Sequence, residues 1–126
     1  NREKFKSENL SAVLNNPESN ANKNLKYLRN AMDVRSELKQ FHPCSEMKCL
    51  SKGRSDIVVI KRSKGPESVF AIHNMTENKI NYQLNDNDLP KIIDNDFNTH
   101  DFLTSTKYNC KNISLDPFQV IWLSAL

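Results

Sequence analysis

The spacing of apolar residues changes near Pro43, and this change constrains the fold more than any other feature of the chain. From Ser19 to Gln40 the apolar residues recur at steps of three and four, which is the period of one helical face. After Pro43, short β-branched stretches alternate with turn residues, as in antiparallel sheets. We therefore predict a mainly β protein, with one or two helices within residues 1–43 and a small antiparallel β-sandwich over residues 44–126.

The helical part of the sequence divides at Pro17. Ser7 is a candidate cap for a short first helix that runs to Leu14, and Pro17 ends it because proline disfavours helical geometry in the residue before it. The second helix, from Ser19 to Gln40, carries an apolar stripe that predicts one buried face. This stripe consists of Leu25, Tyr27, Leu28, Ala31, Met32, Val34, Leu38 and Phe41.

Five or six short strands are predicted after Pro43. The clearest candidates are "DIVVIKR" (56–62), "SVFAIHN" (68–74), "KINYQL" (79–84) and "FQVIWLSAL" (118–126), and the weaker ones are "DFLTS" and "NISL". "SKGPES" is typical of a hairpin turn and joins the first two strands. In the last strand, Phe118, Val120 and Trp122 share the predicted apolar face.

The stretch "FHPCSEMKC", residues 41–49, concentrates His42, Cys44 and Cys49. A zinc site usually takes four ligands in two close pairs, these spacings fit none of the common patterns, and only the fold could bring Cys110 near. A disulfide between Cys44 and Cys49 would need a tight turn and an oxidising compartment, whereas the cysteine count of three is odd. We expect buried or half-buried cysteines that fill space, no metal, no cofactor, and a reduced, cytoplasmic setting.

No local motif predicts catalysis by this chain alone. The histidines lack the known nucleophile motifs, so His73 is predicted to be a hydrogen-bonded structural residue and His100 a solvated one. Carboxylates that could serve a glycosidase or bind calcium are Asp86, Asp88, Asp94 and Asp96. They fall in the polar stretch 85–98, which we predict to be a solvated loop, and such a loop is poorly suited to raising a catalytic pKa. The residues expected to hold this loop down are Leu89, Ile92 and Ile93.

The aromatic residues and the two glycosylation sequons are assigned to no site. Tyr82 and Trp122 fall on apolar strand faces and are predicted to lie in the core, whereas Tyr108 is the freest aromatic residue. The sequons at Asn74 and Asn112 carry little weight, because asparagine is frequent in this chain.

The charge pattern and the lack of a long apolar stretch argue against two classes of partner. The net charge is +3 and both signs are mixed along the chain. The small basic cluster of Lys61, Arg62 and Lys64 is predicted to be a solvated strand end, so no nucleic-acid partner is expected. No stretch approaches the roughly 20 apolar residues that a membrane span needs, so no membrane partner is expected either.

Seven strings, in order over nearly the full length, resemble the C-terminal region of alpha-amylase-family glycoside hydrolases, and more narrowly the sucrose phosphorylase-type branch. They are "NREK", "YLRNAMDVR", "QFHP", "IKRS", "HNMTEN", "DFLTST" and "LDPFQVIWL". The sequence departs from the family pattern at Gln40, Cys44, Phe118 and the pair Ser105–Thr106, where alanine, asparagine, tyrosine and glycine are usual.

The resemblance implies that residues 1–43 are the end of a (β/α)8 barrel and that residues 44–126 are the small sandwich behind it. The family's nucleophilic aspartate, acid/base glutamate and stabilising aspartate lie on earlier barrel strands, so the resemblance implies no catalytic residue here. Arg2 would follow the eighth barrel strand and could contact a sugar oxygen or a phosphate, although a structural salt bridge is equally open. The first residue, Asn1, also leads us to expect a piece of a longer polypeptide.

These observations predict a non-catalytic C-terminal fragment of a retaining, glucosyl-transferring enzyme, either sucrose phosphorylase-like or a glucosidase. Its partner would be the catalytic barrel of the parent chain, and sugar would be reached only through that barrel. Alone, the chain is expected to catalyse nothing, and either to self-associate through its exposed helix stripe or to refold its N-terminal helices onto the sandwich. The alternative is a stand-alone carbohydrate-binding or protein-interaction β-sandwich module.

Overall fold

The computed structural model describes residues 6–89 and 97–125, in two compact units. The first unit, Asn1–Glu37, is helical, and the second, Leu38–Leu126, contains all the described strands. We call them the helical unit and the sheet unit. Some predicted residues lie outside the described residues, namely Arg2, Ile92, Ile93, Asp94 and Asp96.

The helical unit contains α1 (Ser7–Asn15) and α2 (Asn20–Glu37), separated at Pro17 as predicted. Ser7 is not the cap of α1, because Lys6 holds that position without a side-chain bond. Ser19 caps α2 instead, and its hydroxyl accepts the N–H of Asn22 at 3.1 Å. None of the described helices is both long and apolar enough to cross a membrane.

The predicted buried face of α2 is not buried in this structure. None of the α2 residues is buried, and Met32, on the apolar stripe, is 62% exposed. An apolar stripe shows which face a helix can bury, and burial also requires a partner surface. The prediction of a buried face is therefore wrong for the chain by itself.

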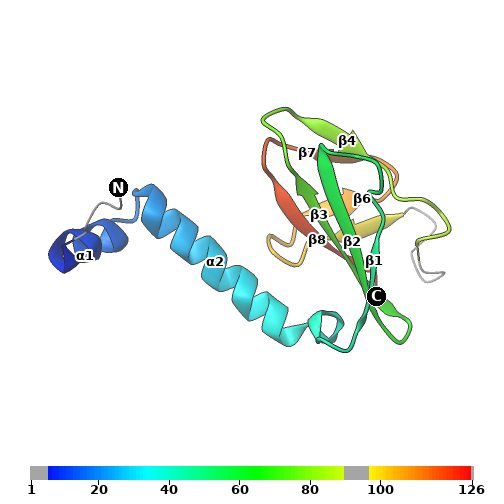
Figure 1. The fold of residues 1–126 in the computed structure, drawn as a ribbon, viewed down its shortest axis with the longest axis horizontal. Coiled ribbons are helices and arrows are strands. Elements are labelled where there is room, and N and C mark those ends of the chain that lie inside the picture. The colour runs from blue at the N-terminus through cyan, green and yellow to red at the C-terminus, as the bar shows by residue number, and fades with distance from the viewer. Residues whose placement is uncertain (1–5, 90–96, 126) are drawn as a thin grey trace. The chain divides into compact units, whose positions relative to one another are not determined.

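The main sheet of the sheet unit has four antiparallel strands in the order β1-β2-β3-β8 (Figure 1). These strands are β1 (Glu46–Cys49), β2 (Ile57–Lys64), β3 (Glu67–Asn74) and β8 (Val120–Ala125). The predicted hairpin joins β2 to β3 through Gly65 and Pro66. Gly65 has a φ of +62°, which suits the first position of a two-residue hairpin loop and which other residues rarely adopt.

Two short ribbons complete the fold. One pairs β4 (Ile80–Tyr82) with β7 (Ile113–Leu115), and the other pairs β5 (Asn98–His100) with β6 (Lys107–Asn109). The core lies between them and the main sheet, and it comprises Ile57, Val59, Phe70, Ile72, Leu84, Cys110, Ile113, Leu115, Ile121 and Leu123. The predicted fold class, a mainly β chain with a small antiparallel sandwich, is confirmed.

Strands β1, β5 and β6 were not among the predicted strands. Each has three or four residues and is largely polar, so it lacks the run of alternating apolar residues that identifies a strand. "DFLTS" is a turn rather than a strand, because Asp101 makes only a single bridge before the chain turns.

The predicted apolar face of β8 is the wrong one. The register places Ile121 opposite Ile72 in the core, so Trp122 points to the other side of the sheet. Phe118 lies before the strand, is 65% exposed and has a φ of +54°. In a strand that is apolar on both sides, the partner strand decides which face is buried.

Candidate functional site

The corner formed by Phe41, His42 and Pro43 is fixed to the four-stranded sheet. A short helix, η1 (Lys39–Phe41), carries the Phe41 ring to 4.7 Å from the Trp122 ring, at a tilt of 45°. Gln40 is buried, and its Nε2 donates to Glu67 Oε2 at 2.9 Å. A buried amide is costly without a hydrogen bond, so this contact holds η1 in place.

Arg62 closes the corner from β2. Its Nε donates to the carbonyl of Gln40 at 3.0 Å, and its Nη2 donates to the carbonyl of His42 at 2.7 Å. The guanidinium group therefore bonds two carbonyls of one turn, which a lysine could not do in the same geometry. The prediction of a solvated basic cluster is wrong for Arg62 and also for Lys61, whose Nζ donates to the carbonyl of Asp88 at 2.6 Å.

The face of the sheet on the side away from the core, which we call the outer face, is also mostly apolar. The register places on it Val58, Ile60, Val69, Ala71, His73, Val120 and Trp122, together with the polar Arg62 and Ser124. Val69, Ala71 and Ser124 are buried, and the others are half-buried. A sheet that is apolar on both sides is typical of one that is covered on both sides, so the outer face and its corner are the candidate interaction surface.

His73 is the histidine on the outer face. Its neighbours on β2 and β8 are Val58 and Val120, neither of which carries a charge. Burial lowers the pKa of His73, because the imidazolium loses hydration without gaining a charged partner. The prediction of a hydrogen-bonded His73 is not confirmed, since its ring makes no hydrogen bond with the described residues.

The residues considered for a metal site are spread over the sheet unit. Cys44 and Cys49 are exposed, whereas Cys110 is buried in the core. His42 is also exposed, and its Nδ1 accepts the N–H of Cys44 at 3.2 Å. Within residues 6–89 and 97–125 no group of three potential ligands is close enough to hold a metal ion. The expectation of buried or half-buried cysteines is therefore wrong for Cys44 and Cys49, which lie on the surface at and before β1.

Burial and hydrogen bonding shift the pKa values of Cys49 and Cys110 in opposite directions. Burial raises the pKa of Cys110 to about 11. A hydrogen bond from the Ser51 hydroxyl, with the Sγ and Oγ atoms 3.7 Å apart, lowers the pKa of Cys49. The surface thiol at Cys49 is therefore more easily ionised than the core thiol.

The predicted solvated loop is partly ordered by ion pairs. Asp88 is buried and accepts a hydrogen bond from Lys48 Nζ at 2.6 Å, while Asp86 is paired with Lys111. Leu89 packs against the core, as predicted. The two described carboxylates of this stretch are thus each held by a lysine, which favours a structural role over calcium binding or acid–base chemistry.

Asp101 is a buried carboxylate that the sequence analysis did not single out. It is fully buried and accepts the N–H of Trp122 at 2.7 Å, the N–H of Leu103 at 3.2 Å and the hydroxyl of Thr104 at 2.7 Å. These bonds join the turn after β5 to the edge of β8. The signal available in the sequence was the "DFLT" string, whose aspartate and threonine are the two side chains of this network.

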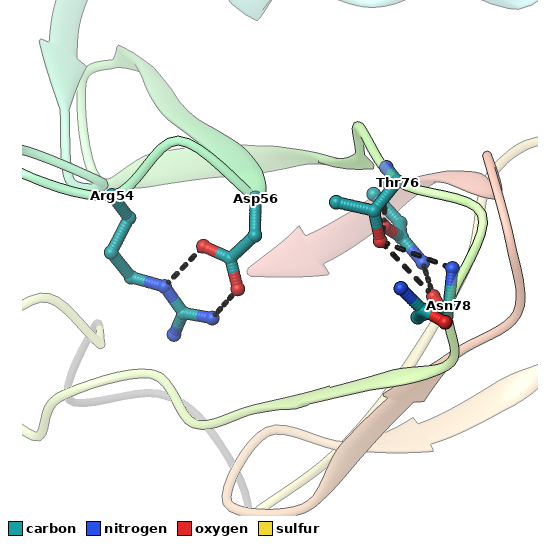
Figure 2. A network of polar contacts seen from close by, with 5 residues as sticks. Arg54, Asp56, Thr76 and Asn78 are labelled. Carbon is teal, nitrogen blue, oxygen red and sulfur yellow. Dashed lines mark hydrogen bonds and ion pairs between the residues drawn. The ribbon is translucent and has the colours of Figure 1, made fainter.

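A second network ties the end of β3 to the next connection (Figure 2). Asn74 is buried, its Nδ2 donates to the carbonyls of Asn78 and Asp116, and its Oδ1 accepts the N–H of Thr76 at 2.9 Å. Figure 2 also shows the bidentate pairing of the Arg54 guanidinium with the Asp56 carboxylate. Because Asn74 is buried and both its amide hydrogens are engaged, the sequon at Asn74 cannot accept a sugar in the folded state.

The aromatic residues offer little free ring surface. Tyr82 packs against the core and the Arg54 guanidinium lies 5.6 Å from its ring centre. Trp122 is half-buried against Phe41 on the outer face, outside the predicted core. Tyr108 is partly buried and its hydroxyl accepts a bond from Gln119 at 2.9 Å, so it is not the free residue that the sequence predicted.

Comparison with solved structures identifies the fold as one found in glycoside hydrolases and related sugar-converting enzymes. The trehalose-6-phosphate hydrolase TreA of Bacillus licheniformis has a TM-score of 0.64 and 17% identity over 92% of this chain. The trehalulose synthase MutB has a TM-score of 0.68 and 13% identity over 90% of this chain. The structure of AmyP in complex with maltotriose has a TM-score of 0.52 and 18% identity over 64% of it.

These likenesses extend to the fold and no further. The chain spans about a fifth of TreA and MutB, which is 20% and 19% of their respective lengths. No protein-family model matches the chain, and no match was found among curated protein sequences.

Proposed function

We propose that this chain is the non-catalytic C-terminal part of an alpha-amylase-family enzyme and that it supports the catalytic barrel of that enzyme. The observation that carries the proposal is the extent of the structural match. About nine-tenths of the chain, from helices to sheet, aligns with one-fifth of each larger enzyme. In this proposal residues 1–43 complete the barrel and residues 44–126 form the sandwich behind it.

Two surfaces of the chain support this proposal, each considered within its own unit. The apolar stripe of α2 is exposed, and the outer face of the sheet is apolar although the core lies on its other side. A parent enzyme would cover the exposed stripe of α2 and complete the cover of the half-buried outer face, because exposed apolar surface is costly in water. The corner held by Arg62 and Gln40 would then fix the direction in which the chain leaves the sheet.

The finer assignment is to a retaining enzyme of the sucrose phosphorylase type, or to a glucosidase, in the cytoplasm. It is supported by the seven strings of the sequence and by the odd number of cysteines. Arg2 is proposed to reach the substrate phosphate or a sugar oxygen at the mouth of the barrel. Substituting Arg2 by alanine in the parent tests this role, and unchanged kinetics for phosphate and sugar would contradict it.

A stand-alone carbohydrate-binding module is supported less well. Such a module needs an aromatic platform, and Trp122 and Tyr82 are each covered on one side by a neighbouring side chain. Titration with glucose, maltose and sucrose, monitored by the fluorescence of Trp122, distinguishes the two functions. We expect no quenching, and saturable quenching would favour the module.

Reading the coding sequence upstream of Asn1 tests the proposed function directly. We expect a barrel that carries an aspartate, a glutamate and a second aspartate in that order. The full protein should then release glucose or glucose 1-phosphate from a glucoside with retention of configuration, and the 126-residue chain should release neither. An upstream region without a barrel, or turnover by the 126-residue chain alone, would overturn the proposal.

A further inference from the structure

The two edges of the four-stranded sheet differ in how their backbone groups are satisfied. At the β8 edge, the N–H of Trp122 donates to Asp101, and its carbonyl accepts the N–H of Phe102 at 2.9 Å. The hydroxyl of Thr99 donates to the next outward carbonyl, that of Ser124. At the opposite edge, β1 pairs with β2 and has no strand on its other side in the part of the chain that the structure describes.

The register shows which backbone groups of β1 face this open edge. The N–H of Leu50 donates to the carbonyl of Val59 at 2.8 Å, so this pair is a hydrogen-bonded one. Bonded and non-bonded pairs alternate along an antiparallel ladder, so Lys48 and Glu46 also bond to β2. Met47 lies between them, and its N–H and C=O therefore point away from β2.

The side chains of β1 are complementary to a second β1 strand that runs in the opposite direction. If two copies pair about Met47, Glu46 of each copy lies opposite Lys48 of the other. The two Met47 residues then form the hydrogen-bonded pair, so glutamate and lysine fall at the closer, non-bonded position, with Cα atoms about 4.5 Å apart. Met47 is 66% exposed, and its thioether would be covered by the same residue of the second copy.

We propose that β1 pairs with β1 of a second copy of this chain about a two-fold axis, which joins two four-stranded sheets into one. A two-fold interface needs a surface that is its own complement, and the order Glu46, Met47, Lys48 has this property. A surface hollow of about 350 Å³, lined by Glu46, Met47, Lys48, Lys61 and Ser63, lies beside the edge and would receive the incoming glutamate. A lysine on an edge strand commonly opposes pairing, and here Asp88 of the same chain, 2.6 Å from Lys48 Nζ, and the glutamate of the second copy together compensate its charge.

Charge-reversal variants test the proposed register. Glu46→Lys alone places lysine opposite lysine, and Lys48→Glu alone places glutamate opposite glutamate, so each variant should self-associate at least about tenfold more weakly than the natural chain. Mixed in equal amounts, the two variants regain both opposite-charge pairs. We therefore expect heterodimers to form in preference to either homodimer, as measured by native mass spectrometry of isotope-labelled chains and by sedimentation equilibrium.

Hydrogen exchange of the unmodified chain provides a second measurement. The interface of one short edge falls below the roughly 1,200 Å² of a standard interface, so a weak, reversible dimer is expected. Protection of the Met47 amide should rise with protein concentration, while that of Lys48, already bonded to β2, should not change. A chain that stays monomeric up to about 1 mM, or self-association without heterodimer preference, would overturn the proposal.

Discussion

The Asp101 carboxylate accepts the N–H of Trp122 at the β8 edge, a backbone group that a further strand would otherwise bond. We expect Asp101→Ala to destabilise the chain by about 3 kcal/mol, because it leaves the N–H of Trp122 buried without an acceptor. Thr104→Val is the matched control, since it keeps the Asp101 carboxylate and removes the Thr104 hydroxyl, which bonds Asp101 at 2.7 Å, the Thr106 hydroxyl at 2.9 Å and the Thr106 N–H at 3.3 Å. It should cost about 1 kcal/mol. Urea unfolding measures both. If both variants lost the same free energy of unfolding, the carboxylate would not be the centre of this network.

The three cysteines should react in a fixed order. Native protein should show two accessible thiols with a disulfide reagent, Cys49 before Cys44, because hydrogen bonding lowers the pKa of Cys49. Cys110 should react only after unfolding, since it is fully buried and its pKa is raised to about 11. Ser51→Ala should slow Cys49 towards the rate of Cys44. Reaction of three thiols in the native state would contradict the structure of the core.

At the scale of one element, α2 has an apolar stripe and no buried residue. Most helical stability in proteins comes from packing of an apolar face rather than from helix propensity. We expect backbone amides of α2 to exchange about a hundredfold faster than those of β3 in the 126-residue chain, as measured by NMR. Equal protection of α2 and β3 would show that the stripe is covered in solution.

The stability of the folded chain should depend on pH through His73, which lies on β3. The pKa of His73 is lowered from its ordinary 6.5, so below that pH the unfolded chain binds a proton that the folded chain does not. Stability should therefore be fully present above about pH 6.5 and should fall as the pH drops towards the lower pKa of the folded state. Urea midpoints between pH 7.5 and pH 5, about the range in which histidine titrates, measure this effect. His73→Gln should flatten the curve, and an unchanged slope in that variant would assign the dependence to other groups.

At the scale of the whole molecule, the strands that could be predicted from the sequence are those whose own residues are continuously apolar or β-branched. β2 and β3 are runs of β-branched and apolar residues, and Gly65 marks the turn between them, so local chemistry was sufficient. The face of β8 was not predictable in this way. Its apolar residues occupy both alternations, and only pairing with β3 decides that Ile121 rather than Trp122 enters the core.

The candidate site was less predictable than the fold, because it depends on long-range polar contacts. Gln40 is polar and typical of a surface position, yet it is buried in η1, where the carboxylate of Glu67 on β3 accepts a hydrogen bond from its amide. In the sequence, Arg62 is part of a small basic cluster. In the fold, its guanidinium group donates to the carbonyls of Gln40 and His42, which the sequence does not show. Residue types indicate hydrogen-bonding capacity, and only the fold shows which capacities are used inside the protein.

The place of β8 in the sheet has a consequence for the order in which the chain can fold. β2 and β3 are joined by a two-residue loop, so their hairpin can form within microseconds. The pairing of β3 with β8 must instead close a loop that contains β4, β5, β6 and β7. Contacts so distant in sequence slow folding, because the entropy of loop closure is lost before the contact is gained. Until β8 pairs with β3, the outer edge of β3 in the central hairpin has unpaired backbone groups. We expect association between partly folded chains to be fastest at this stage.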